Sequence, residues 1–413
     1  MSQLKNLKEQ WKGIFSCMGC GDCGYAIRPA VQRYLTCPVK EAKGDEGFEI
    51  NFSRGRMNVL KSLLQGQIQL SNQLAKWVYE CSECANCSEV CHMTQNENII
   101  LPTCNWIDHV KVWEALRKDL IEAGFAPLER HKDLLDYMEN DNMKNPYGEN
   151  IDQKFAWLQE FPEIKESGDL MFFGGCTIPL RQVETLKNMM KILKVAGKEI
   201  ALSKNEWCCG SIGYRIGDEK PLTKIIKHNV ELFKNSGAKT VFTICAGCYR
   251  TLKKDYPEFL GEELPFEVKH ITEILIDLLN NNKIPFKSEQ VEKLKVTYHD
   301  PCHLGRHMDL YEIPRKVISK IPGIELIEMK RNRKNAWCCG AGGGVKSQFP
   351  DLAIEISKER IREAVESGAN ILITSCPFCI GNLKDAYKTV DQKTQEKIRI
   401  FDIIDFIALK LQF

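Results

Sequence analysis

Trp207-Cys208-Cys209-Gly210 occurs a second time in the chain as Trp337-Cys338-Cys339-Gly340. Around each copy stand three further cysteines in the same order, one upstream and two downstream in the pattern Cys-x-x-Cys. Landmarks that recur in one order at near-constant spacing indicate a duplicated unit. The first five-cysteine set is Cys176, Cys208, Cys209, Cys245 and Cys248, and the second set is Cys302, Cys338, Cys339, Cys376 and Cys379.

Apolar runs predict matching strands in the two copies. Residues 170–173 and 294–298 precede the first cysteine of each set, and residues 240–244 and 371–374 precede the Cys-x-x-Cys pairs. Helical segments such as 179–196 separate these strands, which predicts α/β units with mostly parallel sheets. Open sheets of this kind place their sites at the carboxyl ends of the strands. We therefore expect each cysteine set at one sheet edge.

The chemistry of these two sets is left open by spacing alone. Five cysteines are one more than a cubane iron–sulfur cluster needs, and neighbouring side chains such as Cys208 and Cys209 diverge. The spacing is compatible with an unusual cluster in each unit, or with one cubane and a spare thiol.

The N-terminal part of the chain carries two ferredoxin-type motifs. Residues 17–23 read C-x2-C-x2-C and are followed by Cys37, and residues 81–91 read C-x2-C-x2-C-x3-C. In two-cluster ferredoxins the fourth cysteine of one motif binds the other cluster. The motifs therefore predict two [4Fe–4S] cubanes, the first on Cys17, Cys20, Cys23 and Cys91 and the second on Cys81, Cys84, Cys87 and Cys37.

Zinc is the alternative to iron at the N-terminal motifs. A zinc ribbon uses two C-x2-C pairs about 15–20 residues apart and has no need of a third cysteine in each run. Between the motifs, residues 58–78 carry apolar side chains at helical spacing. This favours a helical ferredoxin-like module.

The amino-acid composition argues against a disulfide-stabilised scaffold and a nucleic-acid-binding protein. The 413 residues hold 19 cysteines, an odd number, and the chain is too long to need a disulfide scaffold. Lys and Arg number 57 against 55 Asp and Glu, so no nucleic-acid partner is expected. No secretory signal or membrane-spanning run is found, which predicts a cytoplasmic protein that reaches a membrane only through a partner subunit. The remaining cysteine, Cys104, is expected to be a small buried side chain.

We expect a multidomain protein of mixed α+β and α/β class. Its N-terminal helical ferredoxin-like domain precedes two tandem α/β cysteine-rich domains related by duplication. The predicted boundaries are 1–125 for the ferredoxin-like domain, 126–165 for a helical linker, 166–285 for the first cysteine-rich domain and 286–413 for the second.

Three motifs give the chain a specific family resemblance. The stretches 207–210, 299–306 (His-Asp-Pro-Cys-His-Leu-Gly-Arg) and 337–344 are similar to those of tandem CCG domains. Residues 10–413 resemble the D-type subunit of heterodisulfide reductase and related iron–sulfur oxidoreductases. The resemblance implies a non-cubane [4Fe–4S] cluster on each five-cysteine set. It also implies two-electron reduction of the mixed disulfide of coenzyme M and coenzyme B, with electrons arriving through the two cubanes.

Two functions follow from the resemblance. Because all ten cysteines are present, we favour an enzyme that reduces a disulfide, with CoM-S-S-CoB or a related thiol pair as substrate. The alternative is an electron-transfer subunit of a flavin-dependent 2-hydroxy-acid (glycolate or lactate) or acyl-CoA dehydrogenase complex. The sequence has no flavin or nicotinamide motif, so both functions require a redox partner, such as a flavoprotein, a ferredoxin or a membrane cytochrome.

Side chains near the cysteines are candidates for catalysis. His303 follows Cys302 and is expected either to deliver a proton or to orient a cluster ligand. Arg306 is the candidate for binding an anionic substrate group. Arg54 and Arg56 are expected on a solvated face. The glycines of 340–344 lack a nucleotide-binding pattern and predict close backbone approach to a cluster.

Overall fold

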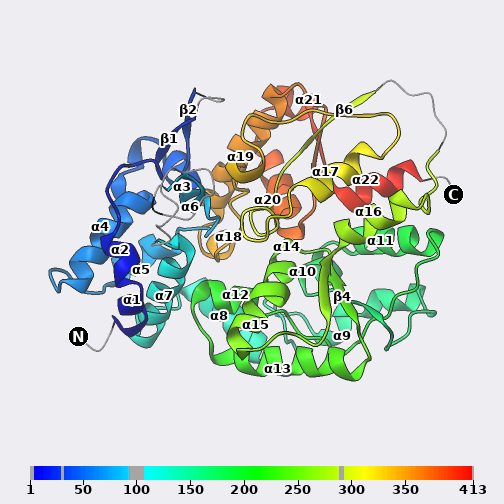
Figure 1. Cartoon of the computed structure of the whole chain (residues 1–413), viewed down its shortest axis with the longest axis horizontal. Helices are drawn as coiled ribbons and strands as arrows, with labels where there is room; N and C mark the ends of the chain where they lie inside the picture. The colour runs from blue at the N-terminus through cyan, green and yellow to red at the C-terminus, as the bar shows by residue number, and fades with distance from the viewer. Residues whose placement is uncertain (1–3, 29–31, 92, 94–106, 288–292, 412–413) are drawn as a thin grey trace. The chain divides into compact units, whose positions relative to one another are not determined.

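The fold is described from a computed structural model of the chain (Figure 1). It covers residues 4–28, 32–91, 93, 107–287 and 293–411. Cys104 lies outside the described residues, so the expectation that it is buried stays a prediction. None of the described cysteines takes part in a disulfide bond.

The chain divides into two compact units that each combine separate segments. Unit 1 consists of Met1–Lys132, Ile212–Glu219 and Lys330–Arg360, and unit 2 of Asp133–Ser211, Lys220–Met329 and Ile361–Phe413. Unit 1 therefore contains both ferredoxin-type motifs and the second Trp-Cys-Cys-Gly loop. The domain boundaries expected from the sequence stay predictions.

Unit 1 is mainly helical, with one antiparallel pair of strands. Capping side chains start its helices: Ser71 accepts a hydrogen bond from the N–H of Leu74, and Asp108 from those of Val110 and Lys111. Its elements are α1 (Lys5–Glu9), α2 (Trp11–Phe15), β1 (Tyr25–Arg28), β2 (Gln32–Leu35), α3 (Pro38–Ala42), α4 (Ser53–Leu64), α5 (Asn72–Tyr79), α6 (Asn86–Val90), α7 (His109–Glu122) and α18 (Val345–Gln348). Residues of both units occur in α8 (Glu129–Glu139), α12 (Ser211–Ile216) and α19 (Pro350–Glu366).

Unit 2 contains two parallel sheets, as the alternation of strands and helices predicts. The first has the order β3-β4-β5 and the second β7-β6-β8-β9. A parallel bridge between Met171 and Ala201 extends the first sheet at the position that β7 takes in the second. The strands are β3 (Leu170–Phe172), β4 (Thr240–Thr243), β5 (Glu267–His270), β6 (Leu294–Tyr298), β7 (Ile324–Leu326), β8 (Ile371–Thr374) and β9 (Arg399–Asp402).

The two sheets share one hydrophobic core. Helix α11, which follows β3, packs on α22, which follows β9, while α16, which follows β5, packs on α17, which follows β6. These helices gather on the right of Figure 1. Each sheet thus contributes a helix from the segment after its first strand and the helix after its last strand to this packing. The helices of unit 2 are α9 (Ile151–Lys154), α10 (Thr177–Arg181), α11 (Val183–Val195), α13 (Lys220–Asn235), α14 (Ala246–Arg250), α15 (Tyr256–Leu260), α16 (Ile271–Asn280), α17 (Glu312–Ser319), α20 (Pro377–Tyr387), α21 (Gln392–Lys397) and α22 (Ile403–Lys410).

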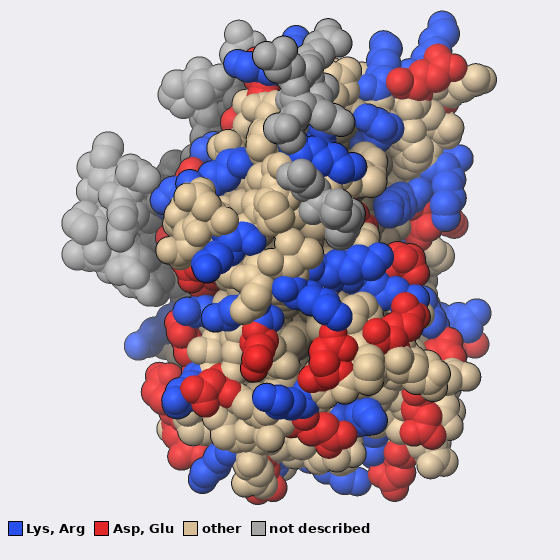
Figure 2. All heavy atoms as spheres, turned by 90° about the vertical axis from the view of Figure 1, so that its right-hand side faces the viewer, with Lys and Arg blue, Asp and Glu red and all other residues tan. Residues whose placement is uncertain are grey.

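The surface agrees with the nearly balanced charge of the chain. In the lower part of the face shown in Figure 2, basic and acidic side chains are interspersed. Within the described part of the chain, every helix is too short or too polar to cross a membrane.

Candidate metal centres

One cavity of unit 1 collects the four cysteines predicted to hold the first cubane. The cavity opens to solvent, has a volume of about 380 Å³ that includes this open part, and is lined by Cys17, Cys20, Cys23 and Cys91. The backbone N–H of Arg54, at the start of α4, donates to Sγ of Cys23 over 3.1 Å. N–H···S contacts of this kind stabilise thiolate charge. The structure brings these four side chains together, and their binding of iron stays a prediction.

A second cavity of unit 1 collects the other predicted group. This cavity also opens to solvent, has a volume of about 420 Å³ that includes the open part, and is lined by Cys37, Cys81, Cys84 and Cys87. The loop that carries the last three has left-handed backbone at Glu83 (φ 52) and Ala85 (φ 61). Non-glycine residues adopt this conformation at a cost and hold it mainly at functional sites.

The environment of these thiols favours a bound cation. Burial raises the pKa of Cys37 to about 11, and burial with neighbouring thiolates raises the pKa of Cys87 well above its usual value. Metal ligation requires the thiolate form. Several thiolates can therefore coexist here only with a positively charged partner, a requirement that an iron–sulfur cluster fits.

Ser53 lines both cavities, although no sequence pattern marks it as a site residue. Its Oγ lies 2.6 Å from Nδ1 of His109, the first residue of α7. Burial lowers the pKa of His109 to about 4, so the imidazole is neutral. A neutral hydrogen-bonded pair thus stands beside both cysteine groups.

The expectation that Arg56 lies on a solvated face is wrong. Arg56 is only 5% exposed, lines the second cavity, and its Nε donates to the carbonyl of Ile50 over 3.0 Å. Its guanidinium lies 5.6 Å from the ring centroid of Trp113. The charge is buried because thiol groups and an aromatic face surround it. Arg54, by contrast, is partly exposed and pairs with Glu49.

In unit 1 the loop that carries Cys81, Cys84 and Cys87 contacts the second Trp-Cys-Cys-Gly loop. Oγ of Ser82 lies 3.5 Å from Sγ of Cys338. A Cβ atom added at Gly342 would lie 2.8 Å from the carbonyl oxygen of Ser82, and one added at Gly343 would lie 2.5 Å from that of Cys81. Glycine is required at both positions because the two backbones approach so closely. The close approach is therefore to the neighbouring loop.

A buried ion pair supports this contact. Nη1 of Arg117, in α7, lies 3.0 Å from Oε1 of Glu83, and both side chains are fully buried. The same guanidinium donates to the carbonyls of Cys81 over 2.7 Å and of Gly343 over 3.0 Å. Arg117 thus joins the loop of Cys81 to the second Trp-Cys-Cys-Gly loop.

The first five-cysteine set lies together in unit 2. Sγ of Cys176 lies 3.9 Å from Sγ of Cys208. Hydrogen bonds with Cys208 and Cys248 lower the pKa of Cys209 to about 6. Cys248 in turn contacts Cys245 through its backbone N–H and its side chain. All five thiols are buried and form one continuous group.

Surrounding side chains hold the first set in place. Nζ of Lys154 lies 2.9 Å from a carboxylate oxygen of Glu206, and the other oxygen accepts from the N–H of Gly174 over 3.2 Å. The Trp207 ring stacks on His228 with centroids 3.7 Å apart. The loop between β3 and the first cysteine is thereby joined to the Trp-Cys-Cys-Gly loop.

The second set is divided between the compact units. Cys338 and Cys339 belong to unit 1, and the other three residues of the set belong to unit 2, where all three are buried. Within unit 2, Cys376 contacts Cys245, and burial and this contact outweigh the hydrogen bond with Cys248 and raise the pKa of Cys245. The first cysteines of the two Cys-x-x-Cys pairs therefore meet.

His303 lies where the two halves of unit 2 meet. A Cβ atom added at Gly247, inside the first Cys-x-x-Cys pair, would lie 3.7 Å from Nδ1 of His303. The His303 ring meets His307 edge-to-face at 4.8 Å. Arg306, in the same loop, is half-buried. A residue of the second half thus faces the first cysteine set.

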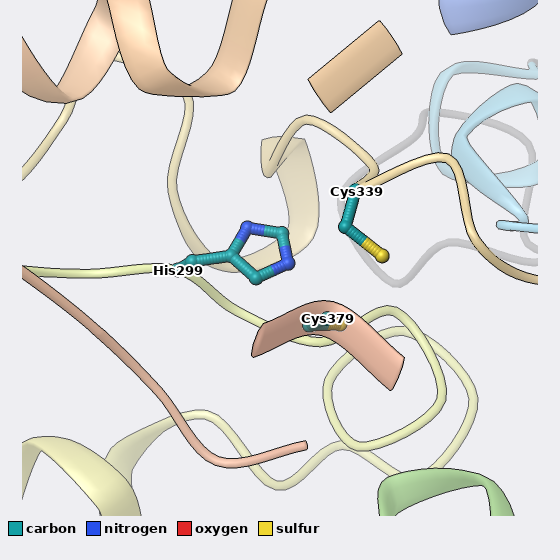
Figure 3. Close-up of side chains that lie close together, drawn as sticks. All are labelled: His299, Cys339 and Cys379. Carbon is teal, nitrogen blue, oxygen red and sulfur yellow. The ribbon is translucent and has the colours of Figure 1, made fainter. Parts of the chain in front are cut away.

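His299 is a further buried group beside a cysteine. It follows β6 directly, and one of its ring nitrogens lies within 4.8 Å of Sγ of Cys379, in the first turn of α20 (Figure 3). Cys339, also drawn there, belongs to unit 1. His299, just before Cys302, is one of three histidines there that could supply protons, and its place directly after a strand also marks it as a site residue.

Comparison with known proteins identifies the family of the chain. The CCG cysteine-rich domain family matches residues 170–253 and 296–384. The chain is 35% identical to the D-type subunit of dihydromethanophenazine:CoB–CoM heterodisulfide reductase from Methanosarcina barkeri, over 98% of this chain and 96% of that protein.

Two further relatives are similar over shorter parts of their length. The B-type subunit of fumarate reductase (CoM/CoB) from Methanothermobacter marburgensis is 30% identical over 79% of this chain and 61% of that protein. The EtfAB:quinone oxidoreductase of Syntrophomonas wolfei is 28% identical over 80% of this chain and 46% of that protein. An iron–sulfur electron-transfer function follows, and the chain belongs to the family of iron–sulfur oxidoreductases that includes the D-type subunit of heterodisulfide reductase.

Proposed function

We propose that this chain reduces a disulfide with electrons relayed through two [4Fe–4S] cubanes to the CCG site. The contact of 3.5 Å between Ser82 and Cys338 carries the proposal, because it joins the loop of the second cubane group to a cysteine of the second set. The balanced reaction takes RSSR′, two electrons and two protons to RSH and R′SH. The electrons come from a redox partner subunit, and the substrate is CoM-S-S-CoB or a related disulfide.

The cysteine sets suit four clusters. The two cavities of unit 1 each offer four cysteines, as a cubane requires. The first five-cysteine set is one contiguous group of buried thiols, and the second repeats its motif. We assign a non-cubane [4Fe–4S] cluster to each of these sets, which when bound would exchange electrons one at a time.

Polar residues near the Cys245–Cys376 contact would donate a proton and bind the substrate. His303 faces the first Cys-x-x-Cys pair, so its imidazole is positioned to give a proton to a thiolate product. Arg306 would bind an anionic group of the substrate. The meeting of Cys245 and Cys376 favours a substrate disulfide held between the two sets.

The architecture supports duplication as the origin of the CCG halves. The strand orders correspond when the Ala201 bridge is counted, and the helices pack in reciprocal pairs. The helical N-terminal segment with its two cysteine groups is proposed to be a ferredoxin-like domain.

Anaerobic purification tests the proposal. The full chain should contain iron and sulfide for about four clusters, and substrate thiols should perturb the EPR signal of a CCG cluster. Turnover of the disulfide with a reduced viologen should fall at least tenfold in His303→Gln, with cluster content unchanged. A chain with full iron content, no response to any thiol and no disulfide turnover would contradict disulfide reduction.

The alternative is an electron-transfer subunit that serves a flavin-dependent dehydrogenase. The similarity to the EtfAB:quinone oxidoreductase favours it. In that case a flavoprotein partner should exchange electrons with the clusters while thiols leave every EPR signal unchanged.

A further inference from the structure

Phe173 and His299 occupy equivalent positions in the two CCG halves. Each directly follows the first strand of its half and stands three residues before the first cysteine of its set. The N–H of Phe173 donates to the carbonyl of Phe242, and that of His299 to the carbonyl of Ile373, both over 2.8 Å. The two side chains therefore start from the same place on the same backbone.

Their chemistry differs. Phe173 is fully buried and meets the Phe233 ring edge-to-face at 5.7 Å, as suits an apolar side chain. His299 is also fully buried, but neither ring nitrogen has a hydrogen-bond partner among the described residues. Leaving a buried polar group without a hydrogen-bond partner destabilises the folded protein. The His299 imidazole therefore requires a hydrogen-bond partner, and that partner must belong to the group that the second cysteine set binds.

The neighbour of the imidazole indicates what that partner is. One ring nitrogen lies within 4.8 Å of Sγ of Cys379, a residue of the second set (Figure 3). A neutral imidazole carries one N–H donor. The five cysteines of the set already supply the ligands of the proposed non-cubane cluster, so the imidazole is not required as a sixth ligand to iron. The hydrogen-bond acceptors near the imidazole are then sulfur atoms, those of the cysteines and of the cluster that they are proposed to hold.

We propose that His299 donates an N–H hydrogen bond to a sulfur atom of the cluster held by the second cysteine set. This rests on the proposed function, because it requires that cluster. The donor stabilises the additional negative charge of the reduced cluster and raises its reduction potential. The first set has Phe173 at the same position and lacks this donor, so the second set is the more easily reduced of the two.

Redox titration of the cluster-loaded full chain, followed by EPR, tests the inference. His299→Phe copies the first half and removes the donor, whereas His299→Gln keeps an N–H. At the wild-type midpoint, His299→Phe should lower the ratio of reduced to oxidised second cluster about tenfold, a shift of 59 mV for one electron. His299→Gln should stay closer to wild type. Exchangeable-proton coupling in the ENDOR spectrum should disappear in His299→Phe only.

Controls separate this inference from the proposed function. Cys208→Ser and Cys338→Ser assign the signals of the two sets, and Phe173→Leu should leave the second signal unchanged. An unchanged potential and an unchanged proton coupling in His299→Phe would overturn the donor role. Loss of iron from the second set in both His299 variants would make the residue a ligand and also overturn it. If no CCG cluster signal exists in wild type, the proposed function fails first.

Discussion

The two Trp-Cys-Cys-Gly loops have the same local geometry and different surroundings. In each, the glycine N–H points to Sγ of the first cysteine, over 3.5 Å from Gly210 to Cys208 and over 3.3 Å from Gly340 to Cys338. Both glycines have positive φ. The first loop is anchored by Lys154 in unit 2, and the second packs against the loop of Cys81, Cys84 and Cys87 in unit 1.

The comparison of the two loops shows which features are the same in both copies of the site and which differ. The cysteines and the N–H that faces them are common to both loops, because they bear directly on the thiolates. The neighbours differ, and in unit 1 they connect the second loop through Ser82 to the cysteines predicted to hold the second cubane. Under the proposed relay, the second half receives the electrons from the cubanes, and the donor His299 raises its potential.

The largest expected effect comes from the two buried ion pairs, one at each loop. Arg117→Met removes the nearer of two guanidinium groups beside the buried Glu83, the other being that of Arg215 at 3.9 Å, and it removes the bonds to the carbonyls of Cys81 and Gly343. Breaking a buried pair in this way costs about 3–5 kcal/mol. Thermal unfolding should show the loss of stability. EPR should show that the second cubane and the second CCG signal weaken together.

Lys154→Met is the matched variant at the first loop. It leaves Glu206 unpaired and should cost a similar amount of stability. Here the first CCG signal should weaken while both cubane signals persist. Equal damage to all four signals in both variants would show that the loops are not independently anchored.

A pH dependence distinguishes the second loop from the first. Nε2 of His131, in α8, donates to the carbonyl of Gly344 over 3.0 Å. Burial lowers the pKa of His131 from 6.5 to about 4. The folded protein therefore binds fewer protons than the unfolded chain between these values, and stability falls as the pH falls. Between pH 7 and pH 5 the free energy of unfolding should drop by about 2 kcal/mol from this group.

His131→Gln keeps a donor and does not titrate, so it serves as the reference. The difference in unfolding temperature between wild type and His131→Gln should shift in favour of the variant as the pH falls from 7 to 5. Parallel curves for the two proteins would contradict a neutral His131 in the folded state.

The sequence predicted the features that short-range patterns encode. The ferredoxin-type spacing predicts that the fourth cysteine of each motif joins the first three of the other motif. In unit 1, Cys91 lines the cavity of Cys17, Cys20 and Cys23, and Cys37 lines that of Cys81, Cys84 and Cys87. Alternating strands and helices predicted parallel sheets, because parallel strands need a crossover.

Contacts between distant segments could not be predicted in the same way. Ser82 and Cys338 are 256 positions apart in the sequence, and no local sequence pattern indicates that they are in contact. The burial of Arg56 was missed because a charged residue is usually solvated, and only the folded structure shows the thiols and the Trp113 ring that compensate for it. The glycines of 340–344 predicted a close approach to a cluster, whereas at Gly342 and Gly343 the structure shows a close approach to the backbone of Ser82 and Cys81.

The smallest effect expected is also the most specific to the second loop. Ser82→Ala removes the hydroxyl beside Cys338 and leaves the cavity of the second cubane group otherwise intact. A hydrogen bond of this kind contributes about 1 kcal/mol, which corresponds to about a fivefold change in an equilibrium. Freeze-quench EPR should show electrons arriving at the second CCG cluster several times more slowly, with iron content unchanged. Thr177→Val is the matched change in the first set, where Oγ1 lies 4.0 Å from Sγ of Cys176, and it should leave that rate unaltered. If both variants transfer electrons at the wild-type rate, the Ser82–Cys338 contact has only a structural role. The two Trp-Cys-Cys-Gly loops would then have different neighbours, but this contact would not make the second loop the one that receives electrons.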